Sequence, residues 1–200
     1  MKNEILYQNS YNPTVFSLIE DRESLLDIGC ADGLLGKQLH ARFPHMRIDG
    51  VEYSPHLAEK AKPFYSNVYV QDVMGFTSRS RYDIVVMGDI LEHLVEPSMV
   101  LTNVKSYLNN DGFIIVSLPN VANWQVRYRL LCGNFDPDLG ILCREHLHFY
   151  TRRTAANLLY AAGWRIAEMK TNNSRIKLLG RIWPELFAFQ FVFKCTPLSH

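Results

Sequence analysis

Four apolar runs of this chain end at an acidic residue or at a glycine beside one. The first ends at Asp27 and passes into a glycine-spaced loop, and the next two end at Glu52 and Asp72. The fourth ends at Gly88-Asp89. Ligands of open α/β sheets bind beyond the carboxyl ends of the strands. If the four runs are parallel strands of one sheet, we expect these side chains to converge on one binding site.

The loop "DIGCADGLLG" after the first run suits a ligand that carries no phosphate groups. Dinucleotide-binding loops space their glycines as G-x-G-x-x-G, so that a helix N-terminus can meet a pyrophosphate. Here Ala31 takes the place of the second glycine, and the loop contains no cationic residue before Lys37. Asp27 and Asp32 would also place negative charge where two phosphates would lie. The Ala31 methyl group is tolerated if the backbone angle at this position is ordinary.

A nucleoside that carries an amino acid would use these acids well. Its ammonium group could meet acid or carbonyl oxygens at the loop, and the Glu52 carboxylate could bind both ribose hydroxyls. Asp72 could accept a hydrogen bond from an adenine amino group. Structural interpretations compete with these: Asp27 could cap the loop, Asp72 could form a turn, and Asp89 could cap a following helix.

Strand and helix patterns alternate along the chain, which indicates an α/β fold with a parallel sheet and helices on both faces. The apolar runs predict strands at residues 25–28, 47–51, 67–70, 82–89, 113–120, 165–169 and 187–195. Helical spacing and capping residues predict helices at 34–43, from 54 onward, at 97–108 and at 151–162. A turn is expected at 109–112.

Length and composition describe one globular domain over residues 1–200, with 48% hydrophobic and 20% charged residues. The net charge of +1 provides no bulk attraction for nucleic acid, so no nucleic-acid partner is expected. No apolar run reaches the roughly 18–20 residues that cross a bilayer. The four cysteines form no CxxC pair, which is typical of free thiols in a reducing compartment. We therefore expect a cytoplasmic protein.

These motifs resemble those of class I S-adenosylmethionine-dependent methyltransferases over most of the chain. "LLDIGCADG" resembles the first motif of the family, "VEYS" the second and "QDV" the motif at the adenine edge. "YDIVVMGDILEHL" resembles the fourth-strand motif, which lies along the methionine part of the cofactor. The resemblance implies a Rossmann-like, seven-stranded, mostly parallel sheet with an antiparallel last strand. It also implies that S-adenosylmethionine is the cofactor.

The resemblance assigns Glu52 to the ribose hydroxyls of the cofactor. Tyr7 and Tyr11 lie just before a proline, and we expect residues 1–20 to form an N-terminal flap over the cofactor. The expected cofactor-binding residues are Tyr11, Asp27, Gly29, Cys30, Ala31, Gly33, Glu52, Tyr53, Asp72, Val73, Gly88 and Asp89.

Residues 121–150 interrupt the strand–helix pattern, and we expect this insertion to form a wall of the acceptor site. The segments "SLPNVANW" and "REHLHFYTRRT" resemble small methyltransferases of polysaccharide and secondary-metabolite pathways. The expected acceptor is therefore a small molecule or a glycan, bound by a monomer or homodimer. Arginines of the insertion could clamp an anionic acceptor or simply face solvent. The expected acceptor-binding residues are Asn120, Trp124, Arg127, Tyr128 and Arg144.

Three histidines, His93, His146 and His148, are candidates for catalysis. An imidazole titrates near neutral pH, so one of them could take the proton of an acceptor hydroxyl or orient that hydroxyl. Each histidine taken alone is more often structural. Some methyltransferases bind a divalent ion with a Glu-x-x-Glu-His…His cluster, and the similar set here is Asp89, Glu92, His93 and His146. Of these two functional interpretations the general base is favoured over the metal site, and no divalent metal is expected.

The predicted reaction is methyl transfer from S-adenosylmethionine to a small molecule or glycan, in the first place to oxygen. The open alternatives are nitrogen or carbon methylation of a small metabolite, and a noncatalytic module that binds S-adenosylmethionine. The loop acids and Ala31 disfavour a nicotinamide-dependent oxidoreductase. The near-neutral charge disfavours an RNA methyltransferase. Because the cofactor carries an activated methyl group, no obligatory catalytic dyad is needed.

Overall fold

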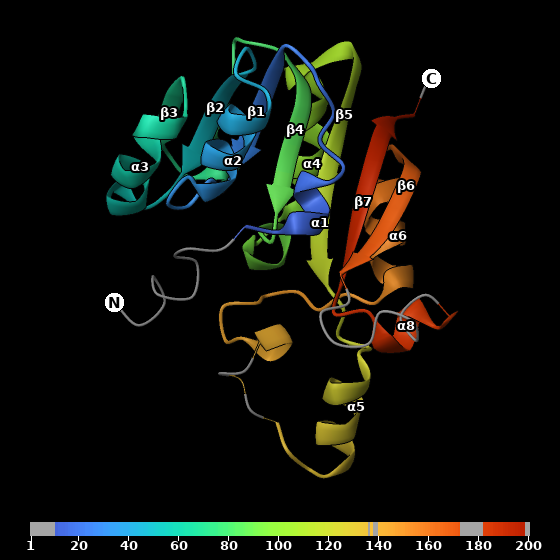
Figure 1. Cartoon of the computed structure of the whole chain (residues 1–200). Helices are drawn as coiled ribbons and strands as arrows, with labels where there is room; N and C mark the ends of the chain where they lie inside the picture. The colour runs from blue at the N-terminus through green and yellow to red at the C-terminus, as the bar shows by residue number, and fades with distance from the viewer. Residues whose placement is uncertain (1–10, 136, 138–139, 173–181, 199–200) are drawn as a thin grey trace.

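One seven-stranded sheet organises the chain (Figure 1). The computed structural model describes residues 11–135, 137, 140–172 and 182–198. Within these residues the strand order is β3-β2-β1-β4-β5-β7-β6. The strands are β1 Ser24–Ile28, β2 Arg47–Glu52, β3 Asn67–Val70, β4 Tyr82–Gly88, β5 Leu108–Pro119, β6 Trp164–Asn172 and β7 Gln190–Pro197.

The first five strands run parallel to one another, and β7 is reversed. β1 pairs in parallel with β2 and β4, β2 pairs with β3, and β4 pairs with β5. β7 lies antiparallel between β5 and β6. The expected α/β sheet, mostly parallel with an antiparallel last strand, is therefore confirmed. Because parallel strands end at the same edge, the segments after β1, β2 and β4 meet there.

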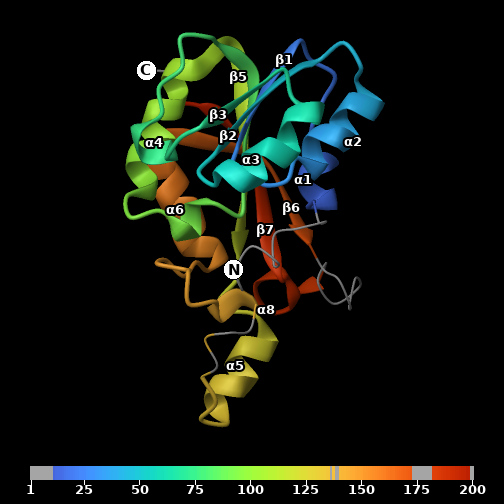
Figure 2. The same ribbon diagram turned by 90° about the vertical axis from the view of Figure 1, so that its left-hand side faces the viewer.

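Helices cover both faces of the sheet, as Figure 2 shows. α4 and α6 pack on one face, where Leu101 and Leu159 belong to one apolar cluster. α1 and α2 pack on the other face, where Val15 and Leu39 belong to a second cluster. Burial on both faces explains the continuous apolar runs of the central strands. The helices are α1 Pro13–Phe16, α2 Leu34–Arg42, α3 Pro55–Ala61, α4 Pro97–Val104, α5 Trp124–Leu131, α6 Arg152–Ala161 and α8 Pro184–Phe187.

Capping residues start α3 and α6 where the sequence predicts helices. The Ser54 hydroxyl accepts a hydrogen bond from the Leu57 N–H, and a proline follows at the first helical position. Thr151 and Thr154 cap α6 reciprocally, each side chain accepting from the backbone N–H of the other. These caps satisfy N–H groups that have no partner within the helix.

The structure differs from the sequence prediction at the start of β5. Residues 109–112, expected as a turn, belong to the strand. The register with β4 jumps between Tyr82 and Ile84, so β5 carries extra residues at this point. Asn109 stabilises the irregularity because its side-chain amide donates a hydrogen bond to the Asp83 carboxylate at 2.7 Å.

Three other boundaries also shift. The helical pattern predicted to reach residue 108 ends as α-helix at Val104 and continues as a 3₁₀ turn. β6 is longer than the predicted 165–169. β7 begins at Gln190 and not at residue 187, because Pro184 starts the short helix α8 just before it.

α5 projects away from the carboxyl edge of the sheet (Figure 1). Its first turn is capped by Asn123, whose side-chain oxygen accepts from the Gln125 N–H at 3.0 Å. The chain then returns toward the sheet through a 3₁₀ turn at Gly140–Leu142. Among the helices that the structure describes, none has the length and apolar character needed to cross a membrane.

Candidate active site

A cleft opens at the carboxyl ends of β1 and β4. Its wall combines the glycine loop, the end of β4 and the first described residues of the chain. Three aspartates line it, and no lysine, arginine or histidine is among its described lining residues. Such a wall favours a cationic ligand over a pyrophosphate. The expected cofactor-binding residues that line it are Tyr11, Asp27, Gly29, Cys30, Ala31, Gly88 and Asp89.

Asp27, in β1, is held in place by Tyr65. The tyrosine hydroxyl donates to Asp27 Oδ2 at 2.5 Å and accepts from the Gly36 N–H at 3.1 Å. Burial raises the pKa of the Asp27 carboxyl to about 6; the Tyr65 hydrogen bond opposes this, and the charge of Glu52 adds to it. At neutral pH the carboxyl is ionised, so it can attract an ammonium group in the cleft.

Two glycines make room for the Tyr65 ring. A Cβ at Gly36 would lie 2.3 Å from Cε2 of the ring, and one at Gly50 would lie 3.1 Å from Cδ1 of the ring. Gly36 therefore leaves the space in which the Tyr65 ring packs, and Tyr65 in turn holds Asp27. Tyr65 carries no motif of its own, although a glycine inside a helix is a sign that something packs closely there.

Glu52 ends β2 and binds the backbone around the glycine loop. Its two carboxylate oxygens accept from the N–H groups of Ala31 at 3.0 Å and Ser54 at 2.8 Å. Each carboxylate oxygen can accept two hydrogen bonds, so both keep capacity for the hydroxyls of a ribose. This position agrees with the expected role of Glu52, which stays a prediction.

Ala31 adopts a left-handed backbone conformation with a φ of 46°. The condition for tolerating a methyl group at this position, an ordinary backbone angle, is therefore not met. A left-handed conformation costs a residue with a Cβ roughly 1–2 kcal/mol, which glycine would avoid. The hydrogen bond from the Ala31 N–H to Glu52 offsets this cost by tying the loop to β2.

Like Glu52, the remaining expected cofactor residues are not among the lining residues of the cleft. Gly33 has a φ of 84°, and a Cβ there would lie 2.7 Å from Ala61 Cα, so it lets the loop pack closely on α3. Asp72 accepts from a backbone N–H two residues later, as its turn-forming interpretation requires. Tyr53 is exposed and Val73 begins a 3₁₀ turn. Cofactor contacts of these residues stay predictions.

Asp89 forms part of the cleft wall beyond β4, also in a left-handed conformation, with a φ of 53°. Its Oδ1 accepts from Ser117 Oγ at 2.6 Å and from Gln190 Nε2 at 2.8 Å. Burial raises the pKa of the Asp89 carboxyl, and these two hydrogen bonds oppose that shift. The turn that follows has no side-chain cap, so the interpretation of Asp89 as a helix cap is wrong.

Asn12, Asn172 and Gln190 are cleft residues that the motifs do not reveal. The Gln190 side-chain oxygen accepts from Asn12 Nδ2 at 2.9 Å, while its amide binds Asp89. Gln190 starts a strand whose next three residues are apolar and buried. A polar side chain at such a position is the sequence signal that could have found it.

The N-terminal part of the chain reaches the cleft through Tyr11 and Asn12. The Tyr11 ring packs edge-on against Phe16, with ring centroids 5.6 Å apart. Asn12 caps α1 by accepting from two backbone N–H groups. Tyr7 lies outside the described residues, so a flap formed by residues 1–20 stays a prediction.

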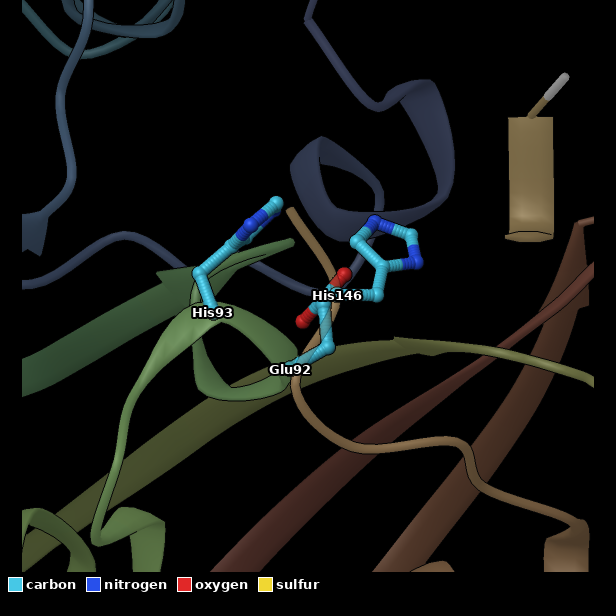
Figure 3. Close-up of side chains that lie close together, drawn as sticks. All are labelled: Glu92, His93 and His146. Atoms are coloured by element: carbon cyan, nitrogen blue, oxygen red, sulfur yellow. The ribbon is translucent and has the colours of Figure 1, made fainter. Parts of the chain in front are cut away.

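Glu92, His93 and His146 come together beside the cleft (Figure 3). Each offers one metal-ligating atom, and these atoms lie within 4.8 Å of one another. The two imidazole centroids are 4.7 Å apart. The N–H groups of Leu147 and His148 donate to the Glu92 carbonyl at 2.8 and 3.2 Å, which ties the end of the insertion to this turn.

Burial shifts the pKa values of Glu92 and His93 toward their uncharged forms. Glu92 is 1% exposed, and within the described residues neither of its carboxylate oxygens has a hydrogen-bond partner. Burial and the charge of Asp89 raise its pKa well above the usual range. Burial, assisted by the charge of His146, lowers the pKa of His93, so this ring is neutral at pH 7.

The structure separates two of the expected residues from this cluster. His148 points its Nε2 toward the Val95 carbonyl at 3.3 Å and is not one of the grouped ligands. Asp89 is also outside the group, because its carboxylate binds Ser117 and Gln190. His93 and His146 are therefore the pair that could act together on an acceptor.

The expected acceptor-binding residues lie outside the cleft wall. Asn120 is buried, and its amide donates to two backbone carbonyls at α8. Trp124 and Tyr128 lie on the projecting helix α5, where they are 39% and 62% exposed. The Arg127 side chain donates to a carbonyl just before its own helix, and Arg144 is exposed. Their contacts with an acceptor stay predictions.

Comparison with curated proteins finds relatives among methyltransferases. Over 122 residues the chain is 25% identical to malonyl-[acyl-carrier protein] O-methyltransferase 1 of Ilyobacter polytropus, covering 58% of this chain and 45% of the relative. Over 108 residues it is 27% identical to trans-aconitate 2-methyltransferase of Escherichia coli, covering 53% and 42%. The match thus spans less than half the length of these relatives.

Solved structures share the fold. The plantazolicin methyltransferase BpumL, in complex with SAH and a desmethylPZN analogue, superposes with a TM-score of 0.69 at 14% identity, covering 99% of this chain and 89% of BpumL. A SAM-dependent methyltransferase of Thermotoga maritima superposes with a TM-score of 0.68 at 16% identity, covering 92% and 86%. These likenesses bear on the fold alone.

The family assignment comes from the sequence. The model of a methyltransferase-domain family matches residues 7–169, which span the glycine loop, Glu52, Asp89 and the histidine cluster. The sheet order, the reversed β7 and the placement of the cleft agree with this match. The chain therefore belongs to the class I S-adenosylmethionine-dependent methyltransferases.

Proposed function

We propose that this chain transfers the methyl group of S-adenosylmethionine to an oxygen atom of a small molecule or glycan. The acidic cleft is the observation that carries this proposal. Asp27, Asp32 and Asp89 line it, and its described wall contains no cationic side chain. S-adenosylmethionine carries a sulfonium and an ammonium group, so its charge complements the cleft, whereas a dinucleotide would be repelled.

The assignment to oxygen is supported by the side chains next to Asp89. In the transfer, the acceptor oxygen bonds to the methyl carbon while the carbon–sulfur bond breaks and its electron pair stays on sulfur. A hydroxyl acceptor must also lose its proton. His93 is neutral at pH 7, and His146 packs against it, so the His93 imidazole can take that proton.

The class of acceptor is supported by the names of the relatives. One is a malonyl-[acyl-carrier protein] O-methyltransferase and the other a trans-aconitate 2-methyltransferase. The rest of the acceleration comes from alignment of acceptor, methyl group and sulfur, which can contribute roughly 7–11 kcal/mol at best.

The test uses methyl-deuterated S-adenosylmethionine and a panel of hydroxylated, carboxylated and amine-bearing small molecules and oligosaccharides. We expect mass spectrometry to find the labelled methyl group in an oxygen-bearing acceptor, and NMR to place it on oxygen. Binding of S-adenosylhomocysteine, measured by calorimetry, checks independently that the cleft is intact.

Three outcomes would contradict the proposal. A labelled methyl group found only on nitrogen or carbon would show that oxygen is not the acceptor atom. Tight S-adenosylhomocysteine binding with no labelled product across the panel would favour a noncatalytic binding module. If the protein does not bind S-adenosylhomocysteine, the assignment of S-adenosylmethionine as its cofactor is contradicted.

A further inference from the structure

We propose that Glu92, His93 and His146 bind a divalent first-row transition-metal ion beside the cleft. The three side chains come from two segments: the turn after β4 and the end of the insertion. Figure 3 shows the Glu92 carboxylate between the two imidazoles in that view. Site formation does not depend on the acceptor, whereas the role given to the ion below rests on the proposed function.

The first argument is the isolation of Glu92. Its side chain is 1% exposed, and neither oxygen has a hydrogen-bond partner within the described part of the chain. A buried carboxyl group without partners costs several kcal/mol, because it loses water and gains nothing in return. A bound cation would replace the lost water by direct contact with these oxygens.

The second argument is the orientation of the two histidines. Nδ1 of His93 lies 3.0 Å from the Glu145 carbonyl oxygen, and Nδ1 of His146 lies 2.9 Å from that of Ile141. A carbonyl oxygen only accepts hydrogen bonds, so each Nδ1 carries a proton, and Nε2 is the atom by which each ring would bind a metal ion. Metal-binding histidines are oriented in this way by a second hydrogen bond.

The third argument is distance and ligand type. The ligand atoms lie within 4.8 Å of one another. Two ligands of one transition-metal ion lie about 3–4 Å apart, because each is about 2.0–2.2 Å from the metal, so small side-chain rotations close the set. Two imidazoles and one carboxylate suit zinc, manganese, iron or cobalt, whereas magnesium and calcium prefer oxygen ligands alone.

Three protein ligands leave coordination positions for an acceptor. Asp89 links the cluster to the cleft, since it lines the cleft and lies three residues before Glu92, between β4 and the turn that carries Glu92. A metal-bound hydroxyl has a lowered pKa and would lose its proton to water before transfer. With the ion bound, both imidazoles would serve as its ligands, and the ion would take over the role in proton loss that the proposed function gives to an imidazole. We infer that acceptors have an oxygen that can coordinate the ion.

The experiment measures metal binding without any acceptor. Full-length protein freed of metal with a chelator is titrated with Co²⁺ and followed by its visible absorption, with bound metal counted by mass spectrometry. We expect one bound Co²⁺, displaced by Zn²⁺ but not by a similar concentration of Mg²⁺.

Variants assign the ligands. Glu92→Gln, His93→Ala and His146→Ala should each weaken Co²⁺ binding by roughly 100-fold or more, since each removes one of three ligands. His148→Ala is the matched control, because His148 lies in the same segment but outside the cluster, and it should bind Co²⁺ like the wild type. Unchanged S-adenosylhomocysteine affinity shows that each variant is folded.

Two results would overturn the site. One is a wild-type protein that binds S-adenosylhomocysteine but no Co²⁺ or Zn²⁺. The other is Co²⁺ binding that survives all three ligand substitutions. Co²⁺ binding that depends on Glu92, His93 and His146, with no labelled product on any acceptor, would support the site and contradict the proposed function. The two proposals can thus fail separately.

Discussion

The proposed cofactor side of the cleft, at the glycine loop, and the proposed acceptor side, at Glu92 beside the cleft, hold their carboxyl groups in opposite ways. On the cofactor side, Asp27 is bonded to the Tyr65 hydroxyl, and Glu52 accepts from two backbone N–H groups. On the acceptor side, both oxygens of Glu92 lack a partner among the described residues. The carboxyl groups of the first side thus have protein hydrogen-bond donors without any ligand. The Glu92 carboxyl group of the second side has none among the described residues.

The first side is therefore preorganised for its ligand, whereas the second gains stability only when it binds a cation or a proton. A carboxylate already fixed by protein donors presents a rigid surface to a cofactor and loses little entropy on binding. A buried carboxyl group without donors is costly until a cation or proton arrives. Substitutions on the cofactor side should therefore weaken cofactor affinity, whereas removal of Glu92 should leave it intact and raise stability.

The largest expected effect comes from Gly36→Ala on the cofactor side. The added Cβ would lie 2.3 Å from the Tyr65 ring, which has no room to move in the core. We expect the free energy of unfolding to fall by about 3 kcal/mol, measured by urea denaturation. Gly75→Ala is the control, because its nearest atom would be 3.8 Å away. An equal loss in both variants would contradict the role of Tyr65.

Glu52→Ala should weaken S-adenosylhomocysteine binding by roughly 100-fold, because it removes the expected ribose acceptor and both bonds that hold Ala31 and Ser54. Calorimetry measures this, with the exposed Glu59→Ala as control. If Glu52→Ala binds S-adenosylhomocysteine within a factor of three of the wild type, Glu52 is not a cofactor-binding residue.

Asp27 makes cofactor binding depend on pH. Its pKa in the folded protein is about 6, raised from the ordinary value by burial. The folded protein thus holds this proton more tightly than the unfolded chain, so the carboxyl group's contribution to stability falls as pH rises from about 4 to 6. Cofactor affinity has the opposite sign, because an ammonium group favours the ionised form.

We therefore expect S-adenosylhomocysteine affinity to be constant above pH 7 and to fall by up to tenfold per pH unit below about 6. Calorimetry between pH 5 and 8 measures this. Asp27→Asn should bind weakly at every pH and lose the slope. A slope that persists in Asp27→Asn would assign the pH dependence to another group.

Glu92→Met tests the acceptor side by its stability. Replacing the partnerless carboxyl by an apolar side chain of similar length should raise the free energy of unfolding of the metal-free protein by about 1 kcal/mol. S-adenosylhomocysteine affinity should stay unchanged. The nearby exposed Glu96→Met serves as control. A destabilised Glu92→Met variant would show that the carboxyl group is satisfied after all.

The smallest effect is expected for Ala31→Gly. Glycine adopts a φ of 46° without steric cost, but it also gives the unfolded chain more freedom, so the net gain should be about 0.5 kcal/mol. Thermal denaturation with and without S-adenosylhomocysteine measures it. Ala58→Gly, inside α3, should instead lose about 1 kcal/mol. Equal losses at both positions would exclude strain at Ala31.

The cofactor side could largely be predicted from the sequence because its geometry is local. Asp27, Glu52 and Asp89 each follow a short apolar run, and the parallel order of the strands brings those ends to one edge. Tyr65 could not be predicted, since its contact with Asp27 depends on the packing of a loop that follows α3. The left-handed backbone of Ala31 could not be predicted either, since its N–H is hydrogen-bonded to Glu52, which lies 21 residues away in the sequence.

The acceptor side could be predicted only in part. The residue types of Glu92, His93 and His146 indicated two kinds of chemistry, but their proximity depends on how the insertion folds back onto the turn after β4. Gln190 is similar, because the strand that carries it pairs with a neighbour far away in sequence. Neither hydropathy nor spacing encodes such long-range placement.

The position of β7 between β5 and β6 has a consequence for synthesis. The ribosome releases the glycine loop early, long before it reaches Gln190, which binds both Asn12 and Asp89 across the cleft. A nascent chain that already contains every cofactor motif thus lacks one wall of its binding site. S-adenosylmethionine would then stabilise chains whose translation has passed β7 more than shorter ones, because only the longer chains contain the complete wall.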